Sequence, residues 1–406
     1  MSAGSPGRVE GEALPLPTSS VTDRESERLA RLELSLMTEP GHPRLAELVT
    51  THGGVDAREW IRNGDGRCPP GWRVALGSAD LTRRAERLLV ASEDTDRRWV
   101  CPGDDEWPSQ LDDLVHLDPL QDRGGVPLGL WVRGPQLLPA MSTAAVAVVG
   151  SRACTEYGAQ IAGDIGADCA ERQLPVVSGA AFGIDAAAHR GALALSGLTV
   201  AVLACGVDVA YPTAHQPMIE RIAAEGLVVS EVCPGTRPSR VRFLARNRVI
   251  AAIASGTVVV EAARRSGALN TLNWAARLGR QTMGVPGPVT SSTSVGVHQV
   301  IRDGGAVLVT SGSEVVEMVA PLGSDTVGWI AGEHRPTDAL GADELAVLEA
   351  VPSRRAAGIA TIASDARVGM EEAITVLGRL MYSGWVERTG DGWRLTRQAA
   401  ERLRHR

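Results

Sequence analysis

The sequence contains no lysine: all 41 basic residues among its 406 are arginine, and the formal net charge is −7. The simplest explanation is a GC-rich genome, because arginine has GC-rich codons. Without lysine the chain cannot form a Walker-type phosphate loop, whose motif requires that residue. Every cationic side chain is instead a planar, permanently charged guanidinium, which suits phosphate and can stack on bases.

The six cysteines are widely spaced and form no CxxC pair, and the eight histidines form no paired cluster. This pattern argues against a zinc site and a disulfide framework and fits a reducing cytosol. No GxGxxG dinucleotide motif is present either. We therefore expect no metal, no cofactor and a cytoplasmic protein.

No apolar run approaches the ~20 residues that span a membrane. The first segment, MSAGSPGRVEGEALPLPTSS, lacks the apolar core of a signal peptide. We expect no contact with a membrane and a disordered tail over residues 1–22.

Phenylalanine is nearly absent, with only two residues in the chain. Phe243 lies in the segment 235–265, which carries seven arginines and one acid, Glu261. Phe182 lies between glycines in SGAAFGID, where no core pattern requires it. Such a reversal of charge in an acidic chain is typical of a polyanion-binding surface. Aromatic residues beside arginines and glycines further favour stacking on exposed bases, so the segment predicts a single-stranded nucleic acid as ligand.

The charge is distributed unevenly along the chain. Residues 1–141 carry 23 acids and 16 arginines, which accounts for the whole net charge. Residues 142–320 carry 13 acids and 14 arginines. We therefore expect an anionic ligand to bind to the middle segment.

The apolar pattern predicts three structured segments before the C-terminal part. Residues 23–63 have helical spacing interrupted by PGHP and a glycine pair, which predicts a small helical module of the SAM or helix-hairpin-helix kind. Residues 64–141 are rich in Trp, Pro and Asp and are expected to form an irregular connector with one or two strands. Over residues 142–320, β-branched runs such as AVAVVG and GTVVVEA alternate with helical stretches. This alternation predicts an α/β fold with a doubly wound, mostly parallel, Rossmann-like sheet.

The C-terminal part predicts a linker and a winged helix. Residues 321–340 resemble a linker, and residues 341–406 predict three helices followed by two strands around a Gly-Asp-Gly turn. Residues 337–406 hold ten acids and ten arginines, and the expected recognition helix begins with Glu371 and Glu372. Acids in that place would repel phosphates, so we expect an interaction or regulatory module.

Two glycine-containing turns follow strands of the expected sheet, whose carboxyl ends bind ligands in such folds. Gly150-Ser151-Arg152 lies where a helix N-terminus can hold phosphate, although a tight turn with a surface arginine explains it equally. In the segment 178–185, Gly179 and Gly183 permit close backbone approach. Asp185 is expected to cap the next helix, and His189 to be a structural or surface residue, because no nucleophile–base pair lies nearby.

The segment Phe243 to Arg248 begins an apolar helix. Arginines at a helix N-terminus oppose the helix dipole and cost stability unless an anion is bound there. We therefore expect Arg246 and Arg248 to contact phosphate, and Asn247 to hydrogen-bond phosphate or base.

Other residues of the arginine-rich segment have a plainer explanation beside the functional one. A solvated basic face is enough to account for Arg237 and Arg240. The strand end at Glu261 leads into a helix that Ser266 can cap. Arg265, next to it, is a candidate for a second phosphate clamp.

These elements, in this order, resemble the DNA-processing protein A family (DprA, also called Smf) over essentially the whole chain. The shared motifs are GSR, SGxAxGID, FxxRNR and EAxxxSGAL, with VPG further on. The resemblance implies a non-enzymatic, sequence-independent protein that binds and protects single-stranded DNA, loads the RecA recombinase and acts in recombination and natural transformation. It implies a DNA pocket formed by Arg152, Ser178, Gly179, Phe182, Gly183, Arg240 or Arg242, Phe243, Arg246, Asn247, Arg248, Arg265, Ser266 and Gly267.

The resemblance also implies a homodimer formed through the C-terminal part of the Rossmann-like domain, where SEVVEMVAPLG is an apolar candidate. Three positions depart from the family pattern. Leu244 stands where proline is usual, Arg265 where lysine is frequent, and GVHQVIRDGG where Gly-x-x-Asn-x-Leu-Ile is usual.

Two rival functions remain open. The sheet also resembles nucleotide phosphoribohydrolases, with Glu261 as the catalytic glutamate, although their PGGxGT loop is replaced by VVVEAARRSGAL. A duplex-DNA regulator acting through the winged helix is disfavoured by the charge of that segment.

Overall fold

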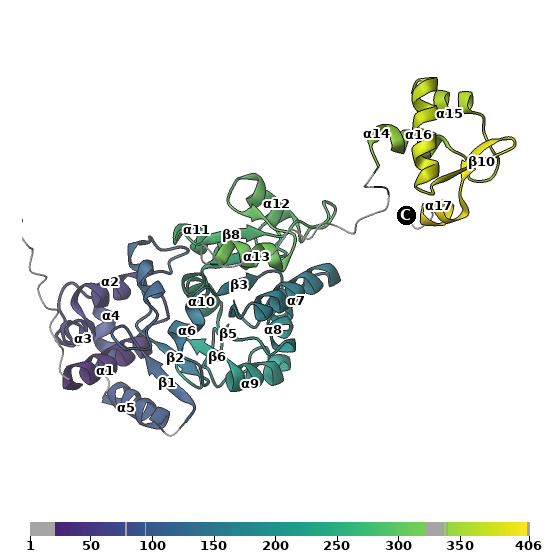
Figure 1. Ribbon diagram of the computed structural model, residues 1–406. Helices are drawn as coiled ribbons and strands as arrows, with labels where there is room; N and C mark the ends of the chain where they lie inside the picture. Colours follow the sequence, from purple (N-terminus) through teal and green to yellow (C-terminus); the bar gives the residue numbers. More distant parts are fainter. Residues whose placement is uncertain (1–20, 78, 94, 321–336, 338–339, 404–406) are drawn as a thin grey trace, which may run out of the picture. The chain divides into compact units, whose positions relative to one another are not determined.

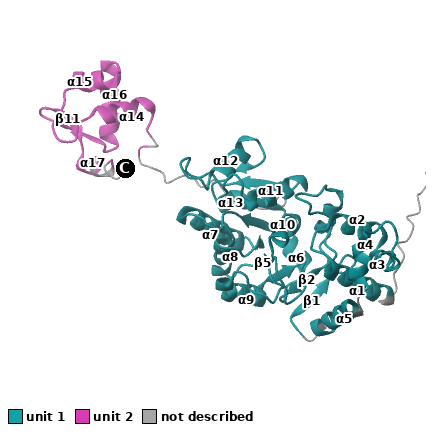
Figure 2. Cartoon of the chain, turned by 180° about the vertical axis from the view of Figure 1, so that it is seen from behind, with its two compact units in different colours: residues 1–327 teal, residues 328–406 magenta. Residues whose placement is uncertain are grey.

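The computed structural model describes residues 21–77, 79–93, 95–320, 337 and 340–403 (Figure 1). The chain divides into two compact units, Met1–Val327 and Gly328–Arg406 (Figure 2). The expected tail lies outside the described residues except for Val21 and Thr22, with which the first helix begins. The expected linker also lies outside them, except for residues 337 and 340.

Five helices open the first unit: α1 (Val21–Met37), α2 (Pro43–His52), α3 (Gly54–Asn63), α4 (Pro70–Leu76) and α5 (Ala79–Glu93). Pro43 occupies the first turn of α2, where a missing N–H costs no hydrogen bond. Gly53 has φ 85° and separates α2 from α3. Buried side chains including Leu34, Leu45 and Ile61 form the core of this bundle.

The segment 64–141 is more regular than expected. Besides α4 and α5 it forms strand β1 (Arg97–Val100), a 3₁₀ helix η1 (Ser109–His116), strand β2 (Leu130–Arg133) and the short helix α6 (Leu138–Ser142). Strands β1 and β2 pair antiparallel, and β2 pairs antiparallel with a strand of the main sheet. The segment therefore extends the sheet instead of merely connecting two domains.

The main sheet has nine strands within the described residues, in the order β1-β2-β6-β5-β4-β3-β7-β8-β9. Its remaining strands are β3 (Val146–Val149), β4 (Val176–Ser178), β5 (Thr199–Val202), β6 (Leu227–Ser230), β7 (Gly256–Val259), β8 (Gln281–Gly284) and β9 (Val307–Leu308). Neighbouring strands from β6 to β9 along this order are parallel. The order reverses between β3 and β7, so the prediction of a doubly wound Rossmann-like fold is confirmed.

Helices cover both faces of the sheet, as the continuous apolar strands require. They are α7 (Glu156–Glu171), α8 (Ile184–Ala194), α9 (Gln216–Glu225, after the 3₁₀ turn η2, Thr213–His215), α10 (Arg240–Ile253), α11 (Gly267–Arg277), α12 (Val295–Arg302) and α13 (Gly312–Val319). One buried cluster joins α7, α8 and α13 to residues such as Val146 and Val148. Another joins α10 and α11 to the alternate residues Ala147 and Val149.

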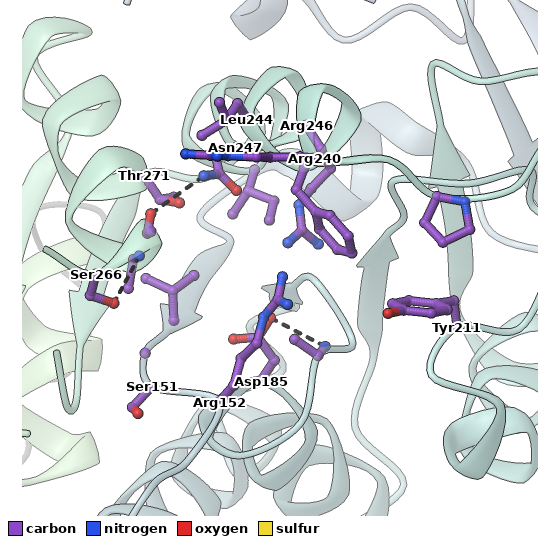
Figure 3. Close-up of a pocket in the computed structure, with 18 of the residues that line it drawn as sticks. Ser151, Arg152, Asp185, Tyr211, Arg240, Leu244, Arg246, Asn247, Ser266 and Thr271 are labelled. Carbon is purple, nitrogen blue, oxygen red and sulfur yellow. Dashed lines mark hydrogen bonds between the residues drawn. The ribbon is translucent and has the colours of Figure 1, made fainter. Parts of the chain in front are cut away.

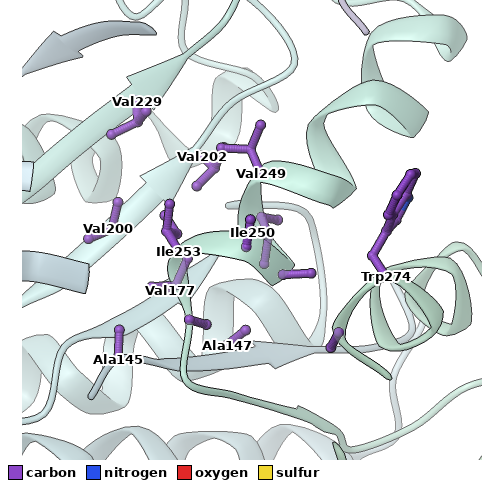
Figure 4. Close-up of a cluster of buried hydrophobic side chains, with 14 of the residues drawn as sticks. Ala145, Ala147, Val177, Val200, Val202, Val229, Val249, Ile250, Ile253 and Trp274 are labelled. Atoms are coloured by element: carbon purple, nitrogen blue, oxygen red, sulfur yellow. The ribbon is translucent and has the colours of Figure 1, made fainter. Parts of the chain in front are cut away.

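The second of these clusters holds α10 in place (Figure 4). Val249, Ile250 and Ile253 pack with strand residues such as Val200 and Val202. All of these side chains are at most 1% exposed. The helix whose N-terminus carries Phe243 and its arginines is therefore fixed to the sheet by its C-terminal half.

The apolar segment proposed for dimerisation is already used inside the unit. Val315, Val316 and Val319 of α13 are buried in the core against α7 and the sheet. The adjacent edge strand β9 instead exposes Val307 and Leu308, by 50% and 47%.

The second unit contains α14 (Ala342–Ala350), α15 (Ile359–Ala366), α16 (Met370–Tyr382), β10 (Val386–Thr389), β11 (Gly392–Leu395) and α17 (Arg397–Arg402). Strands β10 and β11 form an antiparallel hairpin. Three helices followed by a hairpin is the element order expected for residues 341–406, with α17 in addition. Its separate apolar core includes Leu377, Trp385 and Trp393.

Two features are absent from the described residues. None of their helices combines the length and apolar character needed to cross a membrane. Nor do they bring together three or more His, Cys, Asp or Glu side chains in a way that could hold a metal ion.

Candidate nucleic-acid interface

An open cavity of about 630 Å³ lies at the carboxyl ends of β3 and β7, where the strand order reverses (Figure 3). Its walls are the turn after β3, the first half of α10, the start of α11 and part of the loop between β5 and α9. This is the position at which open α/β sheets bind ligands. The predicted residues that line it are Arg152, Arg240, Phe243, Arg246, Asn247, Ser266 and Gly267.

The cavity carries an excess of positive charge. Arg152, Arg240 and Arg246 line it together with one carboxylate, that of Asp185. Arg152 and Arg240 are exposed, and neither forms an ion pair with any residue that the structure describes. Two exposed guanidinium groups without an ion pair among the described residues favour an anion as the ligand of this cavity.

Phe243 lies between these arginines. The Arg152 Cζ atom is 4.6 Å from the centroid of the Phe243 ring, and the Arg246 Cζ atom is 5.9 Å from it. Both distances are within the range of a cation–π contact. Phe243 is half-buried and lines the cavity, so it is not a core residue. It is not a free surface residue either, because the guanidinium groups lie near its ring.

Arg246 forms part of the cavity floor. Its side chain extends over the backbone of Gly179, where an added Cβ atom would come within 1.7 Å of Nη1. Nη1 donates a hydrogen bond of 2.7 Å to the carbonyl of Val202, at the end of β5. Burial lowers the pKa of Arg246, and the nearby carboxylate of Asp185 opposes that shift. Gly179 is therefore needed for the seating of a buried arginine.

The prediction that Asp185 caps α8 is wrong. The N-cap is Gly183, and Asp185 lies inside the first turn. Its Oδ2 accepts hydrogen bonds from the N–H groups of Gly179 (3.2 Å) and Ala181 (3.4 Å). Burial raises the pKa of Asp185, whereas the charge of Arg246 acts in the opposite direction. Asp185 thus fixes the loop on which Arg246 rests.

Three further predicted residues border the cavity without lining it. Ser178 is buried and donates to the carbonyl of Val148 at 2.6 Å. Gly183 has φ 79°, and a Cβ atom there would lie 2.2 Å from the carbonyl oxygen of Ser151. Phe182 is 49% exposed and makes an edge contact with His215, at a centroid distance of 4.7 Å. Ser178 and Gly183 thus lie against the backbone of β3 and of the turn after it, and this turn forms part of the cavity wall.

The structure separates the predicted arginines into two groups. Arg248 is fully buried, and its Nη2 lies 2.7 Å from Oε1 of Glu231. Arg242 forms two hydrogen bonds to the carboxylate of Glu39, at 2.8 and 2.9 Å. Neither lines the cavity, so the expectation that they contact phosphate is not supported by their positions. Arg265 is exposed near the start of α11, outside the cavity lining.

Most of the α10 residues that line the cavity share one face of the helix. Residues three or four apart on a helix share a face. Arg240, Phe243, Leu244 and Asn247 follow this spacing and all line the cavity. Arg248 borders that face, four residues after Leu244, but its side chain is fully buried and pairs with Glu231 instead of lining the cavity.

Asn247 and Ser266 are partly engaged within the chain. The Nδ2 of Asn247 lies 3.3 Å from Oδ1 of Asn270 and 3.4 Å from the carbonyl of Gly267. Ser266 caps α11 and accepts from the N–H of Ala268. The capping role anticipated for Ser266 is confirmed.

Glu261, the residue on which an enzymatic reading depends, does not line the cavity. It is 1% exposed and accepts hydrogen bonds from Thr155 N (2.9 Å), Thr155 Oγ1 (2.6 Å) and Thr293 Oγ1 (3.1 Å). The carboxylate also lies against Gly158, where a Cβ atom would be within 2.5 Å of it. Glu261 therefore anchors the start of α7 inside the protein.

The start of α3, at the turn after α2, is not available to an anionic ligand. The N–H groups of Gly54 and Val55, at the start of α3, donate to the carboxylate of Glu27 at 2.7 and 3.0 Å. Burial opposes ionisation of Glu27, but these bonds and the charge of Arg31 outweigh it and lower its pKa. A carboxylate of the chain itself takes the place that a phosphate would need.

Sequence reasoning missed Tyr211 and Thr271, which also line the cavity. Tyr211 lies in the loop after β5. A Tyr-Pro pair in a rim loop was the available signal.

Comparison with known proteins gives a consistent result. Residues 98–320 match the model of a family described as DNA recombination-mediator protein A. A DNA processing protein DprA of Mycobacterium tuberculosis is 42% identical over 379 residues, which cover 90% of this chain and 94% of that protein. Its Streptococcus pneumoniae counterpart is 41% identical over 208 residues, 51% of this chain and 72% of that protein. The X-ray structure of DprA from S. pneumoniae matches 72% of this chain and 98% of its own, with a TM-score of 0.60 and 31% identity.

The two groups of arginines lead to a stability prediction. Replacing Arg248 by alanine leaves the Glu231 carboxylate buried without its partner, so the free energy of unfolding should fall by about 3–5 kcal/mol. Arg240→Ala, at an exposed position on the same helix, should change it by less than about 0.5 kcal/mol. Urea unfolding of the full chain measures both. Equal stability of the two variants would contradict a structural role for Arg248.

Proposed function

The chain belongs to the DNA recombination-mediator protein A family, and we propose that it is a sequence-independent protein that binds and protects single-stranded DNA. The observation that carries the proposal is the cavity at the strand-order reversal. There the exposed Arg152 and Arg240 line the same cavity as the half-buried Phe243, and Arg152 lies over its ring. Arginine suits phosphate, and an aromatic ring accepts any base on its face. A site for a single strand must hold both the phosphates and the exposed bases, and these two kinds of side chain do so together.

Phosphate groups would contact Arg152 and Arg240 near the N-terminus of α11, where the helix dipole favours an anion. Bases would stack near Phe243. The Asn247 amide nitrogen is already within reach of Asn270 and Gly267, so it is poorly placed to read a base edge. Binding without sequence preference follows.

Selectivity for single strands follows from the half-buried position of Phe243. Its ring lines the cavity together with Arg152, Arg240 and Arg246. A base inside a duplex is stacked and paired, so it would first have to be extruded, which costs a few kcal/mol. A base of a single strand carries no such pairing cost.

We propose no catalytic function. A phosphoribohydrolase-like reaction would require a carboxylate such as that of Glu261 to reach the ligand, but this group is buried and held by Thr155 and Thr293. Asp185, the carboxylate that does line the cavity, is bonded to the backbone of its own loop. Binding is the activity that these contacts favour.

We further propose that the protein acts in the cytoplasm, delivers single strands to the RecA recombinase and contributes to recombination and natural transformation. The predicted winged helix would be an interaction or regulatory module. Exposed acids Glu371 and Glu372 at the start of α16 make that helix a poor partner for phosphates.

Micromolar or tighter binding to oligo-dT is expected, together with much weaker binding to a duplex of equal length. Each phosphate contact should contribute a slope of about −0.7 in the plot of log K against log salt. Fluorescence anisotropy over a salt series measures both properties. Equal affinity for the two forms of DNA, or an affinity independent of salt, would count against the cavity as the binding site.

Arg152 and Phe243 should not act independently. Arg152→Ala should weaken binding and make the salt slope shallower by about one contact, or 0.7. Phe243→Ala should weaken binding by about 1–3 kcal/mol through lost stacking, with little change of slope. Because the two side chains are in cation–π contact, the double variant should be non-additive by at least 0.5 kcal/mol. Strict additivity in variants with unchanged melting temperatures would show that this contact does not shape the site.

We also propose a homodimer that pairs through the β9 edge, since Val307 and Leu308 are exposed on an edge strand next to α13. Val307→Asp with Leu308→Asp should convert the dimer to a monomer in sedimentation velocity. A wild-type protein that sediments as a monomer at micromolar concentration, or a variant that remains dimeric, would contradict this interface.

A further inference from the structure

Tyr211 is an aromatic residue of the cavity that the DNA-contact set proposed above does not include. It lies in the loop 203–215 between β5 and α9, lines the cavity and has 42% of its surface exposed. Its ring centroid is 5.9 Å from that of Phe243, and the two ring planes are inclined by 55°. The rings of Tyr211 and Phe243 therefore meet at one cavity although one comes from the loop after β5 and the other from α10.

The loop that carries Tyr211 is fixed on both sides. The N–H of Gly206 donates to the carbonyl of Thr236 at 2.9 Å, and Oδ1 of Asp208 accepts from the N–H of Gly235 at 2.8 Å. Beyond Tyr211, the Nδ1 of His215 lies 2.9 Å from the carbonyl of Ala180. The loop is thus held by hydrogen bonds on both sides of Tyr211.

The contacts of the Tyr211 side chain do not account for its position. Tyr157, on α7, donates its hydroxyl to the carbonyl of Pro286 at 2.6 Å. No comparable bond to the Tyr211 hydroxyl is found among the described residues. The Tyr211 ring is partly exposed and lines the same cavity as Arg152 and Arg240. An exposed aromatic ring beside arginines suits stacking by a planar ligand.

We propose that Tyr211 is a second base-stacking residue, which holds the nucleobase next to the one on Phe243. This inference rests on the proposed function and extends it. Because the two rings are inclined by 55°, two bases lying on them cannot remain parallel to each other. The strand should therefore be splayed at this step, with its phosphate directed toward the arginines of the rim.

The test compares Tyr211→Ala and Tyr211→Phe with Tyr382→Ala, a matched control at a position that is 96% exposed in the other unit. Affinity for oligo-dT is measured over a salt series, and melting temperatures establish that each variant is folded. Tyr211→Ala should bind about 5- to 150-fold more weakly with an unchanged salt slope. Tyr211→Phe, which keeps the ring, and Tyr382→Ala should bind like the wild type.

A second measurement detects the stacking itself. Oligo-dT with one 5-iododeoxyuridine, irradiated in complex with the wild-type protein, should cross-link to Tyr211, and the attachment site is read by mass spectrometry. Unchanged affinity of a folded Tyr211→Ala protein, together with no cross-link at Tyr211, would overturn this inference and leave single-strand binding intact. A wild-type protein that binds no oligo-dT would overturn the proposed function as well.

Discussion

The buried guanidinium of Arg246 is the contact on which the candidate site depends. It lies on the backbone of Gly179 and donates to the carbonyl of Val202, and the carboxylate of Asp185 is close enough to oppose the lowering of its pKa by burial. Three rim segments, from β4, β5 and α10, are thereby joined around one cation. A buried charge is costly unless it is compensated, and here the carbonyl of Val202 and the carboxylate of Asp185 compensate it. The result is a fixed cavity with residual positive charge.

Charged residues around this point divide between structure and binding. Arg248 with Glu231, Glu261 with Thr155, and Glu27 with the start of α3 are buried or half-buried contacts that hold elements together. Arg152 and Arg240 remain exposed at the rim, without an ion pair among the described residues. An acidic protein can bind a polyanion because its acids are largely placed away from this rim. Local charge, more than net charge, then sets the partner.

The doubly wound, mostly parallel sheet and a cationic, aromatic site at the carboxyl ends of its strands could be predicted from sequence. Continuous β-branched runs specify buried strands, and glycines or arginines at their ends mark one rim. The partner of each arginine could not be predicted, because Arg242 meets Glu39 and Arg248 meets Glu231 only after folding. The joining of β2 to β6 and the approach of Tyr211 to Phe243 are likewise contacts between distant segments.

The most direct test of the central claim is the substitution Gly179→Ala, compared with Gly163→Ala on α7. A Cβ atom at residue 179 would overlap the end of the flexible Arg246 side chain, whereas at residue 163 it would meet only the carbonyl of Ala187 at 3.9 Å. Single-strand affinity and melting temperature are measured for both variants. Our account predicts that Gly179→Ala folds but loses at least about tenfold in affinity, or 1.4 kcal/mol, while Gly163→Ala binds normally. Wild-type affinity in a folded Gly179→Ala protein would contradict the claim that the seated Arg246 builds the binding site.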